Sequence, residues 1–122
     1  MNTHTIATKY HRRYTNSSAI SASGTWNVPI PAPDVERHRY FNQLEVVNLS
    51  SSTIDVKLNL SSDFTYRLPA NSARTLSFTD DNIKYDSISV TDLTGAEIGA
   101  DTIEIVVSKK KLQPVGIDEA ER

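Results

Sequence analysis

Histidines and an acidic turn are the residues of this 122-residue chain best suited to chemistry. His4, His11 and His38 all fall within the first 39 residues, and none of them lies beside a cluster of carboxylates. A zinc site needs three or four convergent ligands, which this spacing does not supply. We therefore expect an exposed His38 and no metal site at the histidines.

The acidic turn is the segment Thr79-Asp80-Asp81-Asn82, in which two carboxylates and an amide follow one another. Oxygen ligands of this kind suit a hard cation such as calcium. The same residue types also form polar turns between strands, closed by a hydrogen bond to an Asp or Asn side chain. We interpret the segment as such a turn and leave open whether Asp80 and Asp81 bind a cation.

Groupings that would support catalysis are missing from the sequence. Its serines include no G-x-S-x-G motif, and no histidine follows residue 39 to act as a base. The four glycines are too scattered for a phosphate-binding loop, and the lack of cysteine excludes disulfides and thiolate metal sites. We predict a protein that is not an enzyme and uses no cofactor.

Membranes and nucleic acids are not expected partners. No run approaches the roughly 20 apolar residues that span a bilayer, and the first residues lack the apolar segment of a signal peptide. Three N-x-S/T sequons, at Asn16, Asn48 and Asn59, are therefore attributed to a serine-rich composition. The run of three lysines at 109–111 suits nucleic acid or an acidic surface, but lysines at a sheet edge also discourage aggregation, which is the interpretation we favour.

From residue 40 onward the sequence is typical of short β-strands. The octet TIDVKLNL at 53–60 alternates polar and apolar residues, so an extended chain would be apolar on one face. Further strands are predicted, with turn residues between them, over 40–49, 64–68, 73–78, 85–92 and 102–109. Strands at this spacing predict an all-β fold, an antiparallel β-sandwich of jelly-roll type. Its predicted core includes Ile54, Val56, Leu58, Leu60, Ile88, Val90, Ile103 and Ile105.

Residues 1–39 are predicted to be an extended N-terminal arm. The stretch from Thr15 to Asp34 is rich in Ser, Asn, Gly and Pro, which argues against a helix, and three prolines at 29–33 exclude a central strand. Residues 19–28 are able to add an edge strand, with Ile20, Ala22 and Trp26 facing inward. We divide the chain into this arm, a sandwich domain at 40–110 and a C-terminal tail at 111–122.

Charge differs in sign between these parts. Five basic and two acidic residues give the arm a net charge of +3, whereas four basic and ten acidic residues give positions 40–108 a net charge of −6. Opposite signs favour contact between the arm and a neighbouring copy. We predict an assembly arm comprising Lys9, Arg12, Arg13 and Trp26, and a homo-oligomer. A solvated arm with incidental charges is the alternative.

Four segments together resemble parts of small β-sandwich virion proteins of bacterial viruses. They are YFNQLEVVNLSSSTIDVKLNL, LPANSARTLSF, ISVTDLTGAEI and TIEIVVSKKK, which span about residues 40–110. Minor capsid, vertex (penton) and decoration proteins belong to this class, and the small jelly-roll vertex proteins of tailless phages are similar in size and layout. The resemblance implies a non-enzymatic capsid component, assembled in the host cytoplasm, that contacts other capsid proteins through its arm.

A second functional class remains open. Aromatic residues in a β-sandwich are able to stack on sugar rings, so the chain is also compatible with a carbohydrate-binding or adhesion module. The candidate stacking residues are Trp26, Tyr40, Tyr66 and Tyr85.

Overall fold

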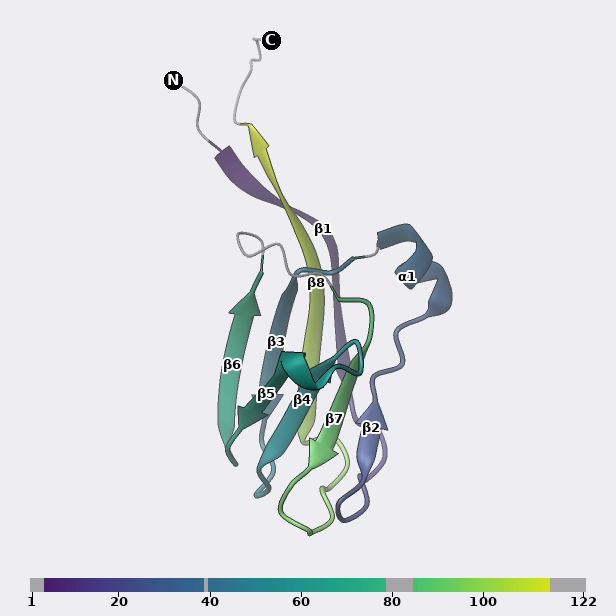
Figure 1. Cartoon of the computed structure of the whole chain (residues 1–122), viewed down its shortest axis with the longest axis vertical. Helices are drawn as coiled ribbons and strands as arrows, with labels where there is room; N and C mark the ends of the chain where they lie inside the picture. The colour runs from purple at the N-terminus through teal and green to yellow at the C-terminus, as the bar shows by residue number, and fades with distance from the viewer. Residues whose placement is uncertain (1–3, 39, 79–84, 115–122) are drawn as a thin grey trace.

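The computed structural model describes residues 4–38, 40–78 and 85–114, with side chains from Thr8 to Lys110, and shows two four-stranded antiparallel sheets (Figure 1). The first sheet has the order β1 (His4–Thr15), β8 (Ile103–Pro114), β3 (Gln43–Asn48) and β6 (Ser72–Ser77). The second has the order β2 (Thr25–Asn27), β7 (Ile88–Asp92), β4 (Ile54–Leu58) and β5 (Thr65–Leu68). This is the strand order of a jelly roll, and the predicted all-β sandwich is confirmed.

The core lies between the two sheets and comes from one parity of each strand. In β4, Ile54, Val56 and Leu58 are completely buried, while Asp55 and Lys57 on the other parity are half-buried. Seven of the eight residues predicted for the core are at most 2% exposed. These seven residues are buried because successive side chains of a strand point to opposite faces, and theirs point to the face between the sheets.

Leu60 is the exception, and its predicted burial is wrong. It is 71% exposed. Strand β4 ends at Leu58, and Asn59 and Leu60 take φ angles of 54° and 56°, in the left-handed region. The amide of Ser61 then donates to the carbonyl of Leu58 at 3.0 Å, which closes a turn. A turn destroys the period of two, so parity no longer predicts burial beyond Leu58.

The N-terminal segment is extended but belongs to the sandwich. Strands β1 and β2 are edge strands of the first and second sheets, so the boundary predicted after residue 39 does not separate two units. Ile20 and Val28 are buried in the common core, whereas Ala22, predicted to face inward, is exposed. The C-terminal boundary also moves, because residues 111–114 continue β8 in register with β1.

Residues 32–38 form a helix, α1 (Ala32–His38), contrary to the prediction that proline and serine prevent one. The prolines lie before the helix and in its first turn, where no backbone N–H is needed for the helical ladder. The carbonyl of Pro31 accepts hydrogen bonds from the amides of Asp34 and Val35 at 3.0 and 3.1 Å. Proline thus starts this helix instead of breaking it.

We predict opposite outcomes for truncating Leu58 and Leu60. Leu58→Ala leaves a cavity between the sheets and is expected to lower the free energy of unfolding by about 2–5 kcal/mol. Leu60→Ala, two residues away on an exposed turn, is expected to change it by less than about 0.5 kcal/mol. Chemical denaturation of both variants measures the difference. Equal losses would contradict the position of the turn.

Candidate functional site

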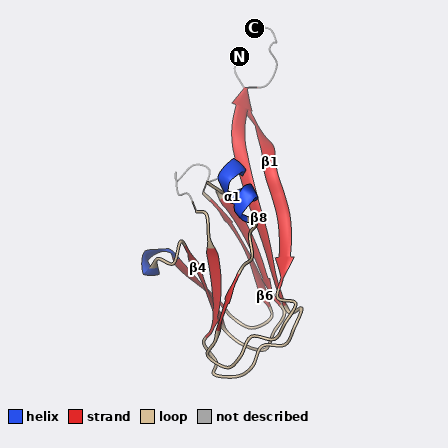
Figure 2. Ribbon diagram, turned by 90° about the vertical axis from the view of Figure 1, so that its right-hand side faces the viewer, coloured by secondary structure: helices blue, strands red, loops and turns tan. Residues whose placement is uncertain are grey.

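A two-stranded ribbon projects from one end of the sandwich (Figures 1 and 2). Strand β3 pairs with β8 only as far as the partners Gln43 and Ser108, whereas β1 follows β8 to the partners His4 and Pro114. We call residues 4–9 and 109–114 the ribbon. It contains the first and last described residues of the chain. No described strand of the second sheet pairs with it.

Asn42 marks the point where the ribbon leaves the sheet. Its side-chain Nδ2 donates to the backbone oxygen of Lys110 at 2.7 Å, and the backbone N–H of Lys110 donates to its Oδ1 at 2.8 Å. One side-chain amide thus satisfies both backbone groups of Lys110, as a neighbouring strand would. The backbone pairing between β3 and β8 is extended by this contact and ends there.

A β-bulge lies in the opposite strand at the same level. Thr8 is paired with Lys110 and Tyr10 with Lys109, so Lys9 is an extra residue in β1. Bulges bend a strand and increase its twist, and they limit pairing at open edges. The bulge therefore sets the direction in which the ribbon departs from the body.

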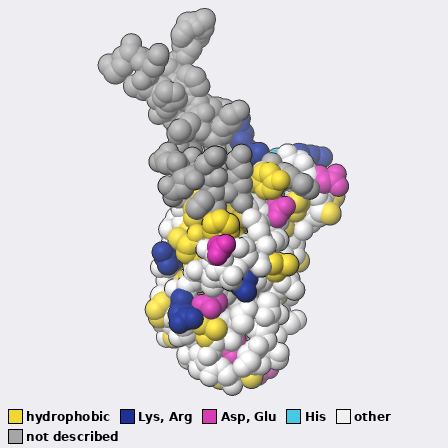
Figure 3. Space-filling model, viewed as in Figure 1, with side chains coloured by type: hydrophobic (Ala, Val, Ile, Leu, Met, Phe, Trp, Pro, Cys, Tyr) yellow, Lys and Arg dark blue, Asp and Glu magenta, His cyan; other side chains and the backbone are white. Residues whose placement is uncertain are grey.

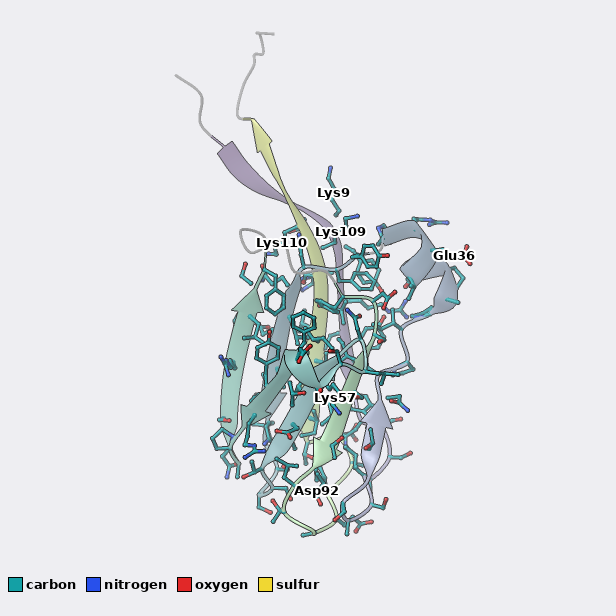
Figure 4. All side chains as sticks on the ribbon, viewed as in Figure 1. Lys9, Glu36, Lys57, Asp92, Lys109 and Lys110 are labelled. Atoms are coloured by element: carbon teal, nitrogen blue, oxygen red, sulfur yellow. The ribbon has the colours of Figure 1, made fainter. Side chains whose placement is uncertain are left out.

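All the Lys, Arg, Asp and Glu residues of the ribbon are lysines. Its twelve positions include Lys9, Lys109, Lys110 and Lys111 and no Asp or Glu. Figure 4 shows Lys9, Lys109 and Lys110 near the point where the ribbon leaves the body. By contrast, basic and acidic side chains are interspersed on the face of the body shown in Figure 3. The ribbon sequence therefore differs from that face of the body in having lysines without interspersed Asp or Glu.

Arg12 and Arg13, predicted to serve the same arm, instead pair with acidic residues of their own chain. Arg12 Nη1 lies 3.1 Å from Asp34 Oδ2, and Arg13 Nη1 lies 3.0 Å from Glu104 Oε2. Both guanidinium groups are on the exposed surface of the body. They lie below the bulge, so of the three basic arm residues only Lys9 belongs to the ribbon.

Helix α1 is fastened to β1 by a shared carboxylate. The hydroxyl of Tyr10 donates to Asp34 Oδ2 at 2.8 Å and lies 3.0 Å from the hydroxyl of Tyr14. Burial, followed by these two hydrogen bonds, raises the pKa of Tyr10 well above its ordinary value. The ring of Tyr10 also contacts those of His38 and Phe41, with centroids 4.8 and 5.2 Å apart. The contacts hold the helix beside the base of the ribbon.

Trp26 is not part of the ribbon, because it lies on β2 in the other sheet. It pairs with Val90 of β7 and packs partly against the core. Its exposed part borders a pocket of about 260 Å³, which is lined by residues 17–21, Thr25 and Trp26. The loop at 16–24 follows the end of β1 opposite to the ribbon. This loop and the ribbon therefore lie at opposite ends of the sandwich (Figure 1), and the pocket lies with the loop.

Asn16 fixes one wall of the pocket. Its Nδ2 donates to the backbone oxygens of Ser18 and Gly99 at 3.2 and 2.9 Å, and its Oδ1 accepts from the amides of Thr102 and Ile103 at 3.1 and 2.9 Å. The side chain is 1% exposed. It joins the loop at 16–24 to the loop that precedes β8, so the two loops cannot move independently.

Asp92 fixes the other end of the same loop. Its carboxylate accepts from the backbone amides of Ser23, Thr94 and Gly95 at 2.8, 2.9 and 3.0 Å. These bonds lower the pKa of Asp92 below its usual value, and the bond from Ser23 has the largest effect. At Gly24 a Cβ would lie 2.4 Å from Ser21 Oγ and 2.8 Å from the Ser21 oxygen, so only glycine fits the tight turn.

The tyrosines considered as stacking surfaces differ in accessibility. Tyr85 is completely buried, and its hydroxyl donates to the backbone oxygen of Gln43, so it offers no surface. Tyr66 is half-buried between the ring of Phe78 and the guanidinium of Arg74. Tyr40 is 43% exposed. Of the four candidates, Trp26 alone borders the described pocket.

Chemistry at the histidines is limited by their surroundings. His11 Nδ1 lies 3.1 Å from Ser108 Oγ, but Ser108 is 1% exposed and closed to a substrate. His38, predicted to be exposed, is half-buried against Tyr10. Within the described ranges, no group of three His, Cys, Asp or Glu residues is placed to hold a metal ion. The segment Thr79-Asp80-Asp81-Asn82 lies outside these ranges.

In the described part of the chain, no helix is long and apolar enough to cross a membrane.

Comparison with known proteins identifies no family. No family model and no curated protein matches the sequence. Two solved structures of variants of a family 29 carbohydrate-binding module match with TM-scores of 0.39 and 0.34 and identities of 8% and 10%. The matches cover 93% of this chain and 93% of the first, and 95% of this chain and 94% of the second. Likenesses this weak carry no functional argument.

We predict that Asp92 makes stability depend on acid pH. Because its folded pKa is lowered, its stabilising effect is complete above the ordinary pKa of 3.8 and is lost as the pH falls through the lowered value. Asp92→Asn is therefore expected to melt lower than the parent at pH 7 and to lose less stability on acidification. Melting curves between about pH 2 and 7 measure this. Parallel pH profiles for the two proteins would contradict the network at Asp92.

Proposed function

We propose that the chain is a non-catalytic structural subunit of a virus particle, a minor capsid component of vertex or decoration type. In this proposal the subunit self-associates and contacts other capsid proteins through the ribbon at residues 4–9 and 109–114. The observation that carries the proposal is the projection of that ribbon beyond both sheets.

Energetics favour a bound ribbon. An isolated two-stranded ribbon is marginally stable in water, because it has no third strand to pair with. Beyond the Asn42 contact to Lys110, β8 pairs with β1 and no longer with the described part of β3. The ribbon sequence itself contains four lysines and no Asp or Glu, so a partner's carboxylates would complement it. A partner that binds only the ordered ribbon shifts the equilibrium toward that form. The ribbon is thus better suited to an assembly contact than to isolation.

Charge indicates what kind of partner would fit. The ribbon carries four positive charges, whereas positions 40–108 have a net charge of −6. Complementary potentials steer association and fix orientation. An acidic surface on a second copy or on another capsid protein is therefore the proposed partner, and no nucleic acid is invoked.

The strand order is compatible with this role but does not establish it. Jelly rolls form viral capsid subunits and also lectin domains. Because one fold supports several functions, the proposal depends on the ribbon and not on the fold. The particle would be assembled in the host cytoplasm.

We predict that removing the outer part of the ribbon, residues 4–8 and 111–114, abolishes self-association and spares the body. A chain of residues 9–110 keeps the Asn42 contact to Lys110 and all pairing between β3 and β8. A chain of residues 4–114 keeps the ribbon and serves as the control. In analytical ultracentrifugation the control is expected to form oligomers and the shorter chain to remain monomeric, with similar melting temperatures. Oligomers of equal mass from both chains would contradict the proposal.

We further predict that salt weakens the association. Raising ionic strength from about 0.05 to 0.5 M shortens the screening length severalfold and weakens exposed charge pairs. The double variant Lys9→Gln/Lys110→Gln should associate more weakly at low salt and respond less to salt. Dissociation constants at several salt concentrations test this. Association that is insensitive to both changes would show that the lysines are not part of the contact.

A carbohydrate-binding or adhesion module is the second candidate, and the pocket beside Trp26 favours it. The two candidates differ in a simple measurement. A monomer that binds glycans would support the second, whereas defined oligomers or co-sedimentation with capsid proteins would support the first.

A further inference from the structure

We propose that the pocket between Trp26 and the loop at 16–24 binds one neutral sugar ring. The indole would contact the apolar face of the ring, and serine hydroxyls would bond its edge. The inference goes beyond the assembly role and rests on the carbohydrate-binding candidate for its class of ligand. Its starting observation is a preformed, uncharged pocket beside an aromatic ring.

Unused hydrogen-bonding groups surround the pocket. Among the described residues, no hydrogen bond is made by the indole N–H of Trp26 or by the hydroxyls of Ser17, Ser18 and Ser21. Each hydroxyl both donates and accepts, and the indole donates. A ligand with several hydroxyls on a compact frame would satisfy such a set.

The lining also excludes other ligand classes. Residues 17–21, Thr25 and Trp26 include no Lys, Arg, Asp or Glu, so nothing in the lining compensates the charge of a phosphate, a carboxylate or an amine. Three serines make the walls too polar for a lipid chain. A neutral ligand with one apolar face and a polar edge remains, and this is the chemistry of a pyranose ring.

Pocket volume limits the occupant to one ring. The 260 Å³ available is slightly below the roughly 300–1,000 Å³ of pockets that enclose drug-sized molecules. A single sugar residue, free or at the end of a glycan, is the largest occupant that we expect. The further sugar residues of a longer glycan would lie outside the pocket.

The walls need little rearrangement to bind. Asn16 and Asp92 hold the two ends of the loop, and the amides of Ile20 and Ile98 each donate to the other's carbonyl at 2.9 Å in between. Preorganised walls reduce the entropy lost on binding. Because the pocket lies opposite the ribbon, a subunit held by its ribbon would present the pocket outward.

The chain offers a direct reporter for this site, because Trp26 is its single tryptophan. The test titrates the full chain with glucose, galactose, mannose, fucose and N-acetylglucosamine, each up to about 10 mM, well into the range of weak single-site binding. Tryptophan emission and backbone amide shifts are the two readouts. At least one sugar is expected to change the emission and to shift the amides of residues 17–21.

Two leucine substitutions in one loop provide the variant and its control. Ser18→Leu fills the pocket, whereas Ala22→Leu adds the same side chain at an exposed position outside the lining. We expect at least a tenfold loss of affinity for Ser18→Leu and no change for Ala22→Leu, with both variants folded by their amide spectra. Should Ser18→Leu fail to fold, Ser17→Leu replaces it.

Two contrary results would distinguish failure of the proposed pocket from failure of the carbohydrate-binding candidate. Sugar binding that persists in Ser18→Leu, with amide shifts elsewhere, would overturn this pocket and leave carbohydrate binding standing. No response to any of the five sugars would overturn both the pocket and the carbohydrate-binding candidate. Neither result bears on assembly through the ribbon.

Discussion

The pairing of β1 with β8 is the contact on which the rest of the molecule depends. It joins the first described strand to the last and brings both ends of the described chain together. Along its lower half, Tyr14 and Ile105 are partners and both are buried in the core. Along its upper half the same two strands continue beyond the end of their pairing with β3. One ladder therefore provides both stability and the proposed contact surface.

The sequence predicts a secondary-structure element well where its residues alternate strongly between apolar and polar, and poorly where other factors decide the structure. Strand β4 was predictable because its alternating residues lie in the middle of a sheet with one buried face. The ribbon was not, because the alternation in β1 is interrupted by the bulge at Lys9 and because β1 pairs with residues about a hundred positions away. The predictions that Leu60 is buried and that no helix forms before residue 39 are wrong for a related reason. A left-handed turn and a proline-initiated helix depend on local backbone geometry, which the alternation of residues does not report.

The polar network at the loop end was also hidden in the sequence. In the sequence, only a sequon marks Asn16, and Asp92 is one of ten acidic residues at positions 40–108. Each is a buried side chain that satisfies several backbone groups of two loops. The serine-rich composition around Trp26 was the one available signal of a pocket. Composition does not indicate whether such a loop is held in place, and here buried hydrogen bonds hold it.

Backbone hydrogen exchange at the ribbon is the most direct test of the central claim. Amides of residues 4–9 and 109–113 would be compared in dilute monomer and in the associated state, with strand β3 as the internal reference. We expect rapid exchange of the ribbon amides in the monomer and strong protection on association, while exchange in β3 is the same in both. Ribbon amides that exchange equally in the two states would contradict a role of the ribbon in assembly.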